Sequence, residues 1–142
     1  MGQARFVEAR VDPLPRAATL LVWATAVLGL VAAGIALLFP DVYRDGDWGK
    51  SQFLGQDAAT VVIAIPLLLG AWWRSREGQL APRFVLAGAL MYFAYSYVLY
   101  AEAAAFNELY LVYLFTASAS FFGLIATLAG VAPDPVVLNP AL

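Results

Sequence analysis

Four long apolar stretches, separated by short polar segments, dominate the pattern along the chain. They cover about residues 17–39, 55–73, 84–104 and 109–130. Each is close to the length of about 20 residues that a helix needs to cross the hydrocarbon core of a bilayer. Short connections make consecutive helices antiparallel neighbours. We therefore predict an all-α integral membrane protein, a four-helix up-down-up-down bundle in which residues 1–142 form a single transmembrane domain.

The basic residues indicate how this bundle is oriented. The amino-terminal arm, residues 1–16, and the segment between the second and third stretches each carry three of them, whereas the first loop has two and the loop at Asn107 has none. In order along the chain they are Arg5, Arg10, Arg16, Arg44, Lys50, Arg74, Arg76 and Arg83. Because Lys and Arg are enriched in cytoplasmic segments, we expect both termini, including the tail 131–142, to be cytoplasmic.

Composition supports the membrane assignment and removes several kinds of chemistry. The chain is 63% hydrophobic and 13% charged, against about 25% charged in soluble domains. So small a chain cannot bury this apolar excess in a core, so the lipid bilayer is a predicted partner. A net charge of −2 and no basic run argue against nucleic acid. With no Cys and no His, we expect no metal site, no haem and no other cofactor.

The second apolar stretch opens on Asp57 and contains Pro66. An ionisable residue inside a span is by default a functional candidate. However, a carboxylate in the first helical turn also caps free N–H groups and meets the favourable end of the helix dipole. Both interpretations of Asp57 stay open. Pro66 lies in the middle of the stretch and should free the carbonyl of Val62, which bends the helix.

Glu102 lies near the carboxyl end of the third stretch, where the helix dipole disfavours a negative charge. Tyr95 and Glu102 are one heptad apart, about 10.5 Å along one helical face. This spacing predicts an inward-facing polar strip. The alternative is that Glu102 lies at the level of the lipid headgroups and is hydrated.

The tyrosines of the third stretch cover more than one helical face, so some of them meet other helices. A buried tyrosine hydroxyl needs a hydrogen-bond partner, and Gln56, Asp57 and Glu102 are the obvious acceptors. We take Gln56, Asp57, Tyr95 and Glu102 as the candidate ligand-binding or polar-network site. Aromatic rings beside acids suit an organic cation, through cation–π attraction and charge.

Two further patterns concern structure rather than chemistry. Asn107 and Glu108 fit a cap and a first-turn acid for the fourth helix. Small or hydroxylated side chains recur at spacings of three and four, which puts them on one face of the first helix and one face of the fourth; they are Ala26, Gly29, Ala33, Thr116, Ser120 and Gly123. Such faces let helices approach closely, and hydroxyls there form interhelical hydrogen bonds or line a narrow polar path.

Two short motifs carry a family resemblance. Gly55–Gln56–Asp57 opens the second helix, and Ala104–Ala105–Phe106–Asn107 leads into the fourth. In these motifs and in its topology the chain resembles small uncharacterised four-span membrane proteins of prokaryotes, over residues 17–129. The resemblance implies a multi-pass protein of the cell membrane and marks Asp57 and Asn107 as positions to test. It brings no activity with it.

Three hypotheses for function follow. The first is a non-enzymatic accessory or assembly component, acting in a homo-oligomer or a larger membrane complex. The second is a small oligomeric transporter, or a protein that binds a cation or small molecule at an outer-half site of acids and tyrosines. The third is an intramembrane enzyme that uses Asp57 and Glu102 as a metal-binding or acid–base pair. We favour the first, because no catalytic motif is present.

Overall fold

The computed structural model describes residues 11–129 and 131, which form helices and connecting loops without β-strands. Most of the predicted arm and tail therefore lies outside the described residues. Four helices in this part of the chain are long and apolar enough to cross a membrane. They are Arg16–Leu38, Asp47–Ser75, Leu80–Ala103 and Tyr110–Ala129. The predicted all-helical class is confirmed.

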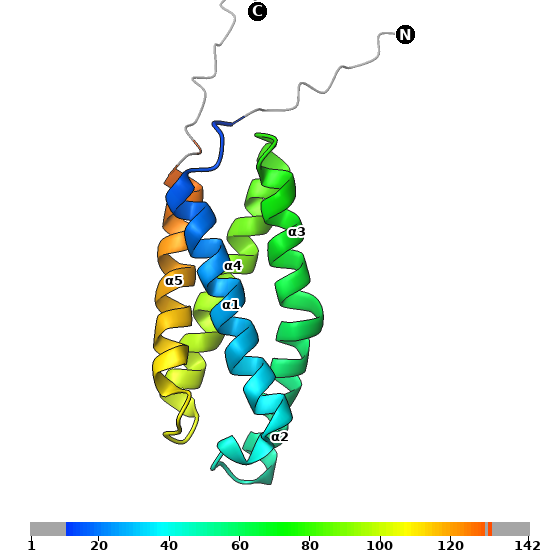
Figure 1. Ribbon diagram of the computed structural model, residues 1–142, viewed down its shortest axis with the longest axis vertical. Coiled ribbons are helices and arrows are strands. Elements are labelled where there is room, and N and C mark those ends of the chain that lie inside the picture. Colours follow the sequence, from blue (N-terminus) through cyan, green and yellow to red (C-terminus); the bar gives the residue numbers. More distant parts are fainter. Residues whose placement is uncertain (1–10, 130, 132–142) are drawn as a thin grey trace, which may run out of the picture.

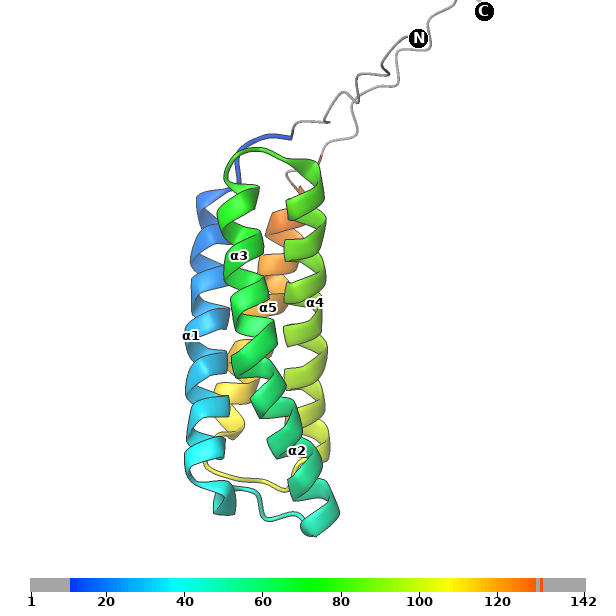
Figure 2. The ribbon, with the colours of Figure 1, turned by 90° about the vertical axis from the view of Figure 1, so that its right-hand side faces the viewer.

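The four helices are α1 (Arg16–Leu38), the second helix, α4 (Leu80–Ala103) and α5 (Tyr110–Ala129). The second helix is continuous but has three parts, α2 (Asp47–Ala59), the π-helical segment η2 (Thr60–Ala64) and α3 (Ile65–Ser75). A short 3-10 turn, η1 (Pro40–Val42), follows α1. Figures 1 and 2 show loops 39–46 and 104–109 at one end of the bundle, which we call the distal end. Loop 76–79 lies at the opposite, proximal end.

The predicted boundaries agree within one residue for the first and fourth helices, but the third helix begins at Leu80, before the predicted start at about residue 84, and the largest difference is at the start of the second helix. That helix begins at Asp47, so the prediction of a polar loop up to residue 56 is wrong. Residues 47–56 are mostly polar, so the hydropathy pattern does not assign them to the apolar stretch, yet they form the first turns of this helix. Asp47 stands in the first turn after Gly46, where a negative charge meets the positive end of the helix dipole.

The bend predicted at Pro66 takes the form of a π-helical turn. Proline has no N–H and its ring collides with the preceding turn, so the regular hydrogen-bond ladder cannot continue through it. The segment Thr60–Ala64 lies just before it, and the N–H of Ile65 reaches the carbonyl of Thr60. This widened turn separates α2 from α3 in the second helix.

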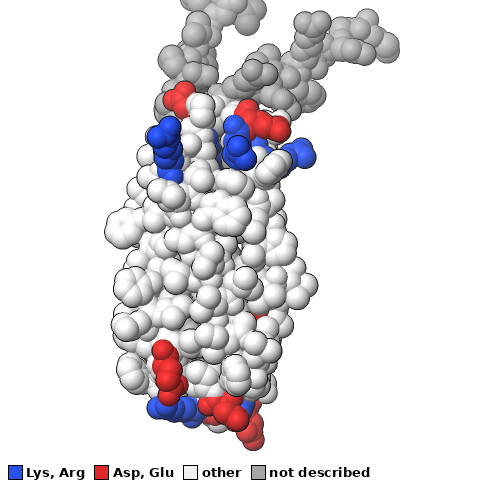
Figure 3. All heavy atoms as spheres, viewed as in Figure 1, with Lys and Arg blue, Asp and Glu red and all other residues white. Residues whose placement is uncertain are grey.

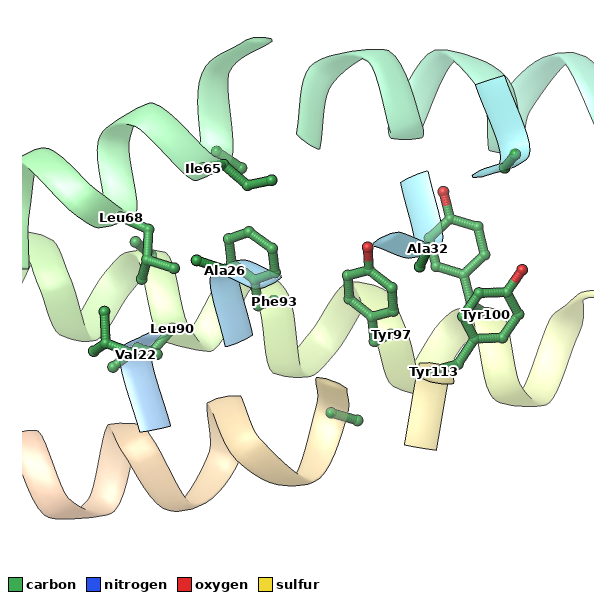
Figure 4. Packing of buried hydrophobic residues seen from close by; sticks show 14 of the residues in the cluster. Val22, Ala26, Ala32, Ile65, Leu68, Leu90, Phe93, Tyr97, Tyr100 and Tyr113 are labelled. Atoms are coloured by element: carbon green, nitrogen blue, oxygen red, sulfur yellow. The ribbon is translucent and has the colours of Figure 1, made fainter. Parts of the chain in front are cut away.

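The core of the bundle has an aliphatic part and an aromatic part. In Figure 4, Val22, Leu68 and Leu90 lie at one end, while the rings of Tyr97, Tyr100 and Tyr113 group at the other. The main packing partners are α1 with α5, and α4 with both α5 and α3. Buried tyrosines at the distal end bring hydroxyl groups into the interior that need partners.

Gly29 allows α1 to approach α4 at the border between these two parts. A Cβ at this position would lie 2.8 Å from a ring carbon of Phe93. The hydroxyl of Tyr97 donates to the Gly29 carbonyl at 3.1 Å. The buried positions Ala26, Gly29 and Ala33 confirm that the small-residue face of the first helix is a packing face.

The two distal loops are tied to each other by polar contacts. Arg44 forms an ion pair with Glu108. The Ala105 backbone N–H donates to the Asp45 carboxyl at 3.1 Å. These contacts hold residues 39–46, which follow α1, over the loop that leads into α5, and thereby place Tyr43 against the core.

Charge and hydropathy divide the surface as expected for a bundle in lipid. Figure 3 shows Lys, Arg, Asp and Glu gathered at the two ends of the molecule, with a nearly uncharged band between them. Large apolar side chains are exposed over this band, among them Leu30, Val62, Met91, Phe115 and Phe121. Water would penalise such a surface, whereas hydrocarbon does not.

Candidate functional site

Asp57 lies well inside the second helix and is 1% exposed. Its carboxyl accepts hydrogen bonds from the hydroxyls of Tyr43 at 2.6 Å and Tyr100 at 2.9 Å. The capping interpretation of Asp57 is therefore wrong, because the helix starts ten residues earlier, at Asp47. The carboxyl joins three elements instead: the first loop, α2 and α4.

Aromatic rings surround this carboxyl group. Ring centroids lie 5.2 Å apart for Tyr43 with Phe53, for Phe53 with Tyr100 and for Tyr100 with Tyr113. Such spacings are typical of favourable offset and tilted ring pairs. We call this group the tyrosine cage; it consists of Tyr43, Phe53, Tyr97, Tyr100 and Tyr113.

Tyr43 enters the tyrosine cage from the loop outside the spans. Burial raises the pKa of Tyr43 far above its usual range, and the neighbouring Tyr100 and Asp57 raise it further. The hydroxyl therefore keeps its proton and remains a donor to Asp57 at any physiological pH. Tyr43 is not among the residues predicted for the site, because nothing local to residues 40–46 indicates that this ring folds back into the core.

A second polar network lies beside the tyrosine cage. The Gln56 amide donates to the hydroxyl of Tyr92 at 2.8 Å and to that of Ser96 at 3.0 Å. The Tyr92 hydroxyl is also 3.3 Å from the hydroxyl of Thr60. These bonds link α2 and η2 to α4. Asp57 accepts from a third-helix tyrosine as predicted, namely Tyr100, whereas Gln56 pairs with Tyr92 as the donor and not as the predicted acceptor.

A pocket of about 340 Å³ opens between α2 and α4 next to this network. We call it the distal polar pocket. Its lining combines two amides, three hydroxyls and apolar ring or aliphatic surface, with no charged side chain: Gln52, Phe53, Gln56, Tyr95, Ser96, Leu99 and Tyr100. Tyr100 belongs both to this lining and to the tyrosine cage, so Asp57 holds one wall of the pocket in position through it.

Tyr95 and Glu102 do not form an inward-facing strip, so that prediction is wrong. Tyr95 is 65% exposed, and Glu102 is exposed as well. They do share a face of α4, but it is the outer face. Tyr95 reaches the distal polar pocket at its edge, whereas Glu102 is outside the lining. A pairing of Asp57 with Glu102 is therefore absent from this arrangement.

Asn107 stabilises the turn before α5, as predicted. Its side-chain oxygen accepts the N–H of Leu109 at 2.9 Å, and its amide donates to the Ala105 carbonyl at 3.2 Å. The residue is buried and lies apart from the lining of the distal polar pocket. This geometry is that of a structural cap.

The hydroxyl face of α5 is buried, but it does not form the interhelical hydrogen bonds that the sequence suggested. Thr116 donates to the Val112 carbonyl at 2.7 Å, and Ser120 donates to the Thr116 carbonyl at 2.7 Å. Both hydroxyls are thus satisfied within their own helix. Like Gly123, these two residues are small, and their size lets α5 pack closely against α1 and α4.

Within residues 11–129 and 131, no three His, Cys, Asp or Glu side chains gather as a metal-ion site would require. Comparison with known proteins adds no function: no family model, no curated protein and no solved structure matches this chain. We therefore infer function from the geometry of the site itself.

Proposed function

We propose that this chain is a multi-pass membrane protein that binds a small uncharged organic molecule, without covalent chemistry, in the distal polar pocket. The observation that carries this proposal is the pocket of about 340 Å³ with amides and hydroxyls in its lining. Small-molecule sites are typically concave, with a volume of about 300–1,000 Å³ and a few polar groups amid apolar surface.

Some lining residues can form hydrogen bonds with a ligand, and others provide apolar contact. Gln56 and Ser96 present hydrogen-bonding groups that are already oriented by their bonds across α2 and α4. Phe53, Tyr95 and Tyr100 offer ring surface. Side chains fixed before binding lose little conformational freedom when the ligand arrives, which favours affinity.

Charge favours an uncharged ligand over the organic cation considered from the sequence. No charged side chain lines the pocket, and Glu102 lies outside it. Both oxygens of the Asp57 carboxyl already accept hydrogen bonds from tyrosines, and the group is buried. A cation in the pocket would therefore lack a direct counterion, and Asp57 acts instead as a positioning residue for Tyr100.

Fluorine NMR on protein that carries 3-fluorotyrosine, in lipid nanodiscs, tests this function with benzyl alcohol as the probe. We expect a saturable shift of the Tyr95 and Tyr100 resonances, assigned with Tyr→Phe variants, and no saturable shift of Tyr110. Partition of the probe into the bilayer produces a linear change instead. Gln56→Leu should weaken binding by roughly threefold to tenfold, because one or two net hydrogen bonds are lost.

Two companion probes test the charge argument, and a second variant guards against misfolding. Benzyltrimethylammonium and benzoate have the same ring with opposite charges, and both should bind more weakly than benzyl alcohol. Gln52→Leu changes an exposed lining residue, so it should lower affinity without affecting stability. If benzyl alcohol gives no saturable shift, or if neither variant weakens it, the proposed function is wrong.

Membrane topology is part of the same proposal. We place the four helices across the cell membrane in up-down-up-down order, with both termini cytoplasmic, which puts the distal end outside. The chain has no native Cys, so single cysteines can report accessibility directly. Gly46→Cys should react with an impermeant maleimide on intact cells. Glu77→Cys should react only after permeabilisation, and the reverse pattern would invert the topology.

An accessory role in a larger assembly is the second candidate. The small-residue faces of the first and fourth helices do not offer a surface for a partner, because they pack inside the bundle. A different observation favours the accessory role. An open, mostly apolar surface depression of about 530 Å³ lies between α4 and α5 and includes Met91, Phe121 and Phe122. A photo-crosslinker at Phe121 should capture a partner chain and one at Val62 should not; equal capture at both positions contradicts this role.

A further inference from the structure

A second, apolar pocket lies between the same two helices, nearer to the middle of the bundle than the distal polar pocket. This second pocket has a volume of about 440 Å³. We call it the apolar pocket. Its lining is almost free of polar atoms and consists of Ala59, Ile63, Ala64, Leu67, Val85, Gly88, Ala89 and Tyr92.

The register of the lining residues places the two pockets one after the other along the same pair of helices, and we call the two together the groove. On α4 the lining residues are either adjacent or three residues apart, which places them on one helical face. From the apolar to the polar end they are Val85, Gly88, Ala89, Tyr92, Tyr95, Ser96, Leu99 and Tyr100. The second helix faces them with Leu67, Ile63, Ala59, Gln56 and Gln52 in the same direction.

Tyr92 marks the border between the two parts. It is a lining residue of the apolar pocket, and its hydroxyl reaches back to Gln56 at 2.8 Å and to Thr60 at 3.3 Å. Polar groups thus end abruptly at Tyr92, and only apolar surface follows. The π-helical segment Thr60–Ala64 lies at the same level, since Thr60 contacts Tyr92 and both Ile63 and Ala64 line the apolar pocket.

The space in the apolar pocket is not filled by the protein. A Cβ added at Gly88 would meet no atom within 4 Å. Ala59 and Ala89 also keep their side chains short along this stretch. Ile63 and Leu67 are exposed, so a chain-like molecule can enter sideways from surrounding lipid. A polar end and an apolar end in one groove match the two parts of an amphiphile.

We propose that this groove binds a single-chain amphiphile with an uncharged, hydrogen-bonding headgroup, of which a monoacylglycerol is the simplest form. This inference rests on the proposed function, since the headgroup occupies the distal polar pocket. The hydroxyls of the headgroup bind Gln56 and Ser96, and the acyl chain passes Tyr92 to lie against Gly88. No Lys or Arg lines either pocket, so a phosphate headgroup has no cation to pair with.

A photoactivatable monoolein, with a diazirine at the middle of its acyl chain, tests the groove in nanodiscs of the wild-type chain. Peptide mapping should place the label on residues 59–67 and 85–92. Excess monoolein should remove it. An oleoyl chain that carries a phosphate or a trimethylammonium headgroup should compete with the label less well than monoolein does. If either charged amphiphile competes better than monoolein, the inferred preference for an uncharged headgroup is wrong.

Two glycines provide a matched pair of variants. Gly88→Leu fills the apolar pocket, and Gly34→Leu puts the same side chain on α1, where an added Cβ also meets no atom within 4 Å. Neither should disturb the bundle, and equal thermal stability of the two proteins checks this. Labelling should fall to background in Gly88→Leu and persist in Gly34→Leu. Equal labelling of both variants would show that the acyl chain does not bind in the groove.

The outcomes separate this inference from the function on which it rests. Benzyl alcohol has no acyl chain and reports the distal polar pocket alone. If benzyl alcohol still binds with saturation while Gly88→Leu leaves the monoolein label unchanged, the pocket function stands and the amphiphile does not. If Gln56→Leu and Gln52→Leu leave both probes unaffected, both proposals are wrong.

Discussion

Replacing Tyr43 by phenylalanine isolates the hydrogen bond that ties the first loop to the buried carboxyl. The Tyr43 hydroxyl donates to Asp57 at 2.6 Å, and its ring packs on Phe53 with centroids 5.2 Å apart. Phenylalanine keeps the ring and removes only the hydroxyl. One oxygen of Asp57 then has no donor in a site that is 1% exposed. Leaving a buried acceptor unsatisfied costs about 1–3 kcal/mol, so we expect Tyr43→Phe to lower the free energy of unfolding by that amount.

A double-mutant cycle with Asp57→Leu tests the cause of this loss. Leucine keeps the branch at Cγ and removes the acceptor. In that background the Tyr43 hydroxyl is itself unsatisfied, so Tyr43→Phe should become neutral or stabilising. The two changes should therefore couple by roughly 1–3 kcal/mol. The assay is reversible unfolding in mixed micelles, or steric trapping in bicelles, followed on all four proteins.

Tyr95→Phe is the control, since this exposed ring has no hydrogen bond that depends on its hydroxyl among those found in the described residues. It should change stability by less than about 0.5 kcal/mol. Equal costs of Tyr43→Phe in the wild-type and Asp57→Leu backgrounds would refute the reasoning, because the loss would then come from ring packing rather than from the hydrogen bond.

Three further predictions concern the free energy of unfolding. Glu102→Gln should change this free energy by less than about 0.5 kcal/mol, because the Glu102 side chain is exposed on α4. Gly29→Leu should destabilise by about 1–3 kcal/mol or more, because even the first carbon of the new side chain would be 2.8 Å from Phe93. Arg44→Ala should cost less than about 1 kcal/mol, because the side chains of Arg44 and Glu108 are 57% and 67% exposed. All three are measured in the same unfolding assay.

Each of these has an outcome that contradicts it. A large loss of stability in Glu102→Gln would mean that this carboxylate takes part in a structural polar network. Gly29→Leu is compared with Gly34→Leu on the same helix, and equal stability of the two would mean that α1 does not approach α4 closely. For Arg44→Ala, the loss should shrink as salt is raised, since exposed ion pairs are screened; a salt-independent loss points to packing instead.

Much of the fold was predictable because it depends on local quantities. The apolar run lengths predicted the four helices, and small residues at spacings of three and four predicted the buried faces of α1 and α5. Where the prediction failed, hydrophobicity was the wrong measure. Residues 47–56 are polar but helical, so a hydropathy pattern misses their turns and misplaces Asp57 at a helix end.

The candidate site was predictable only in part, for a similar reason. Gln56, Asp57 and the need of buried tyrosines for partners followed from residue type and burial in a membrane. Tyr95 and Glu102 were correctly placed on one helical face, but periodicity does not say whether that face turns inward or outward. The packing of α4 against α3 and α5 decides it, and turns Glu102 to the surface.

By itself, the sequence determined that the chain forms four apolar helices, that cysteine and histidine chemistry is absent, and that Asp57 and Gln56 need partners. Only the tertiary structure decided that Tyr43 folds back onto Asp57 and that a polar and an apolar pocket lie in succession between the second helix and α4. Helical periodicity acts over a few residues, whereas these contacts join segments far apart in the chain. Their geometry depends on how the helices pack against one another, which no local pattern encodes.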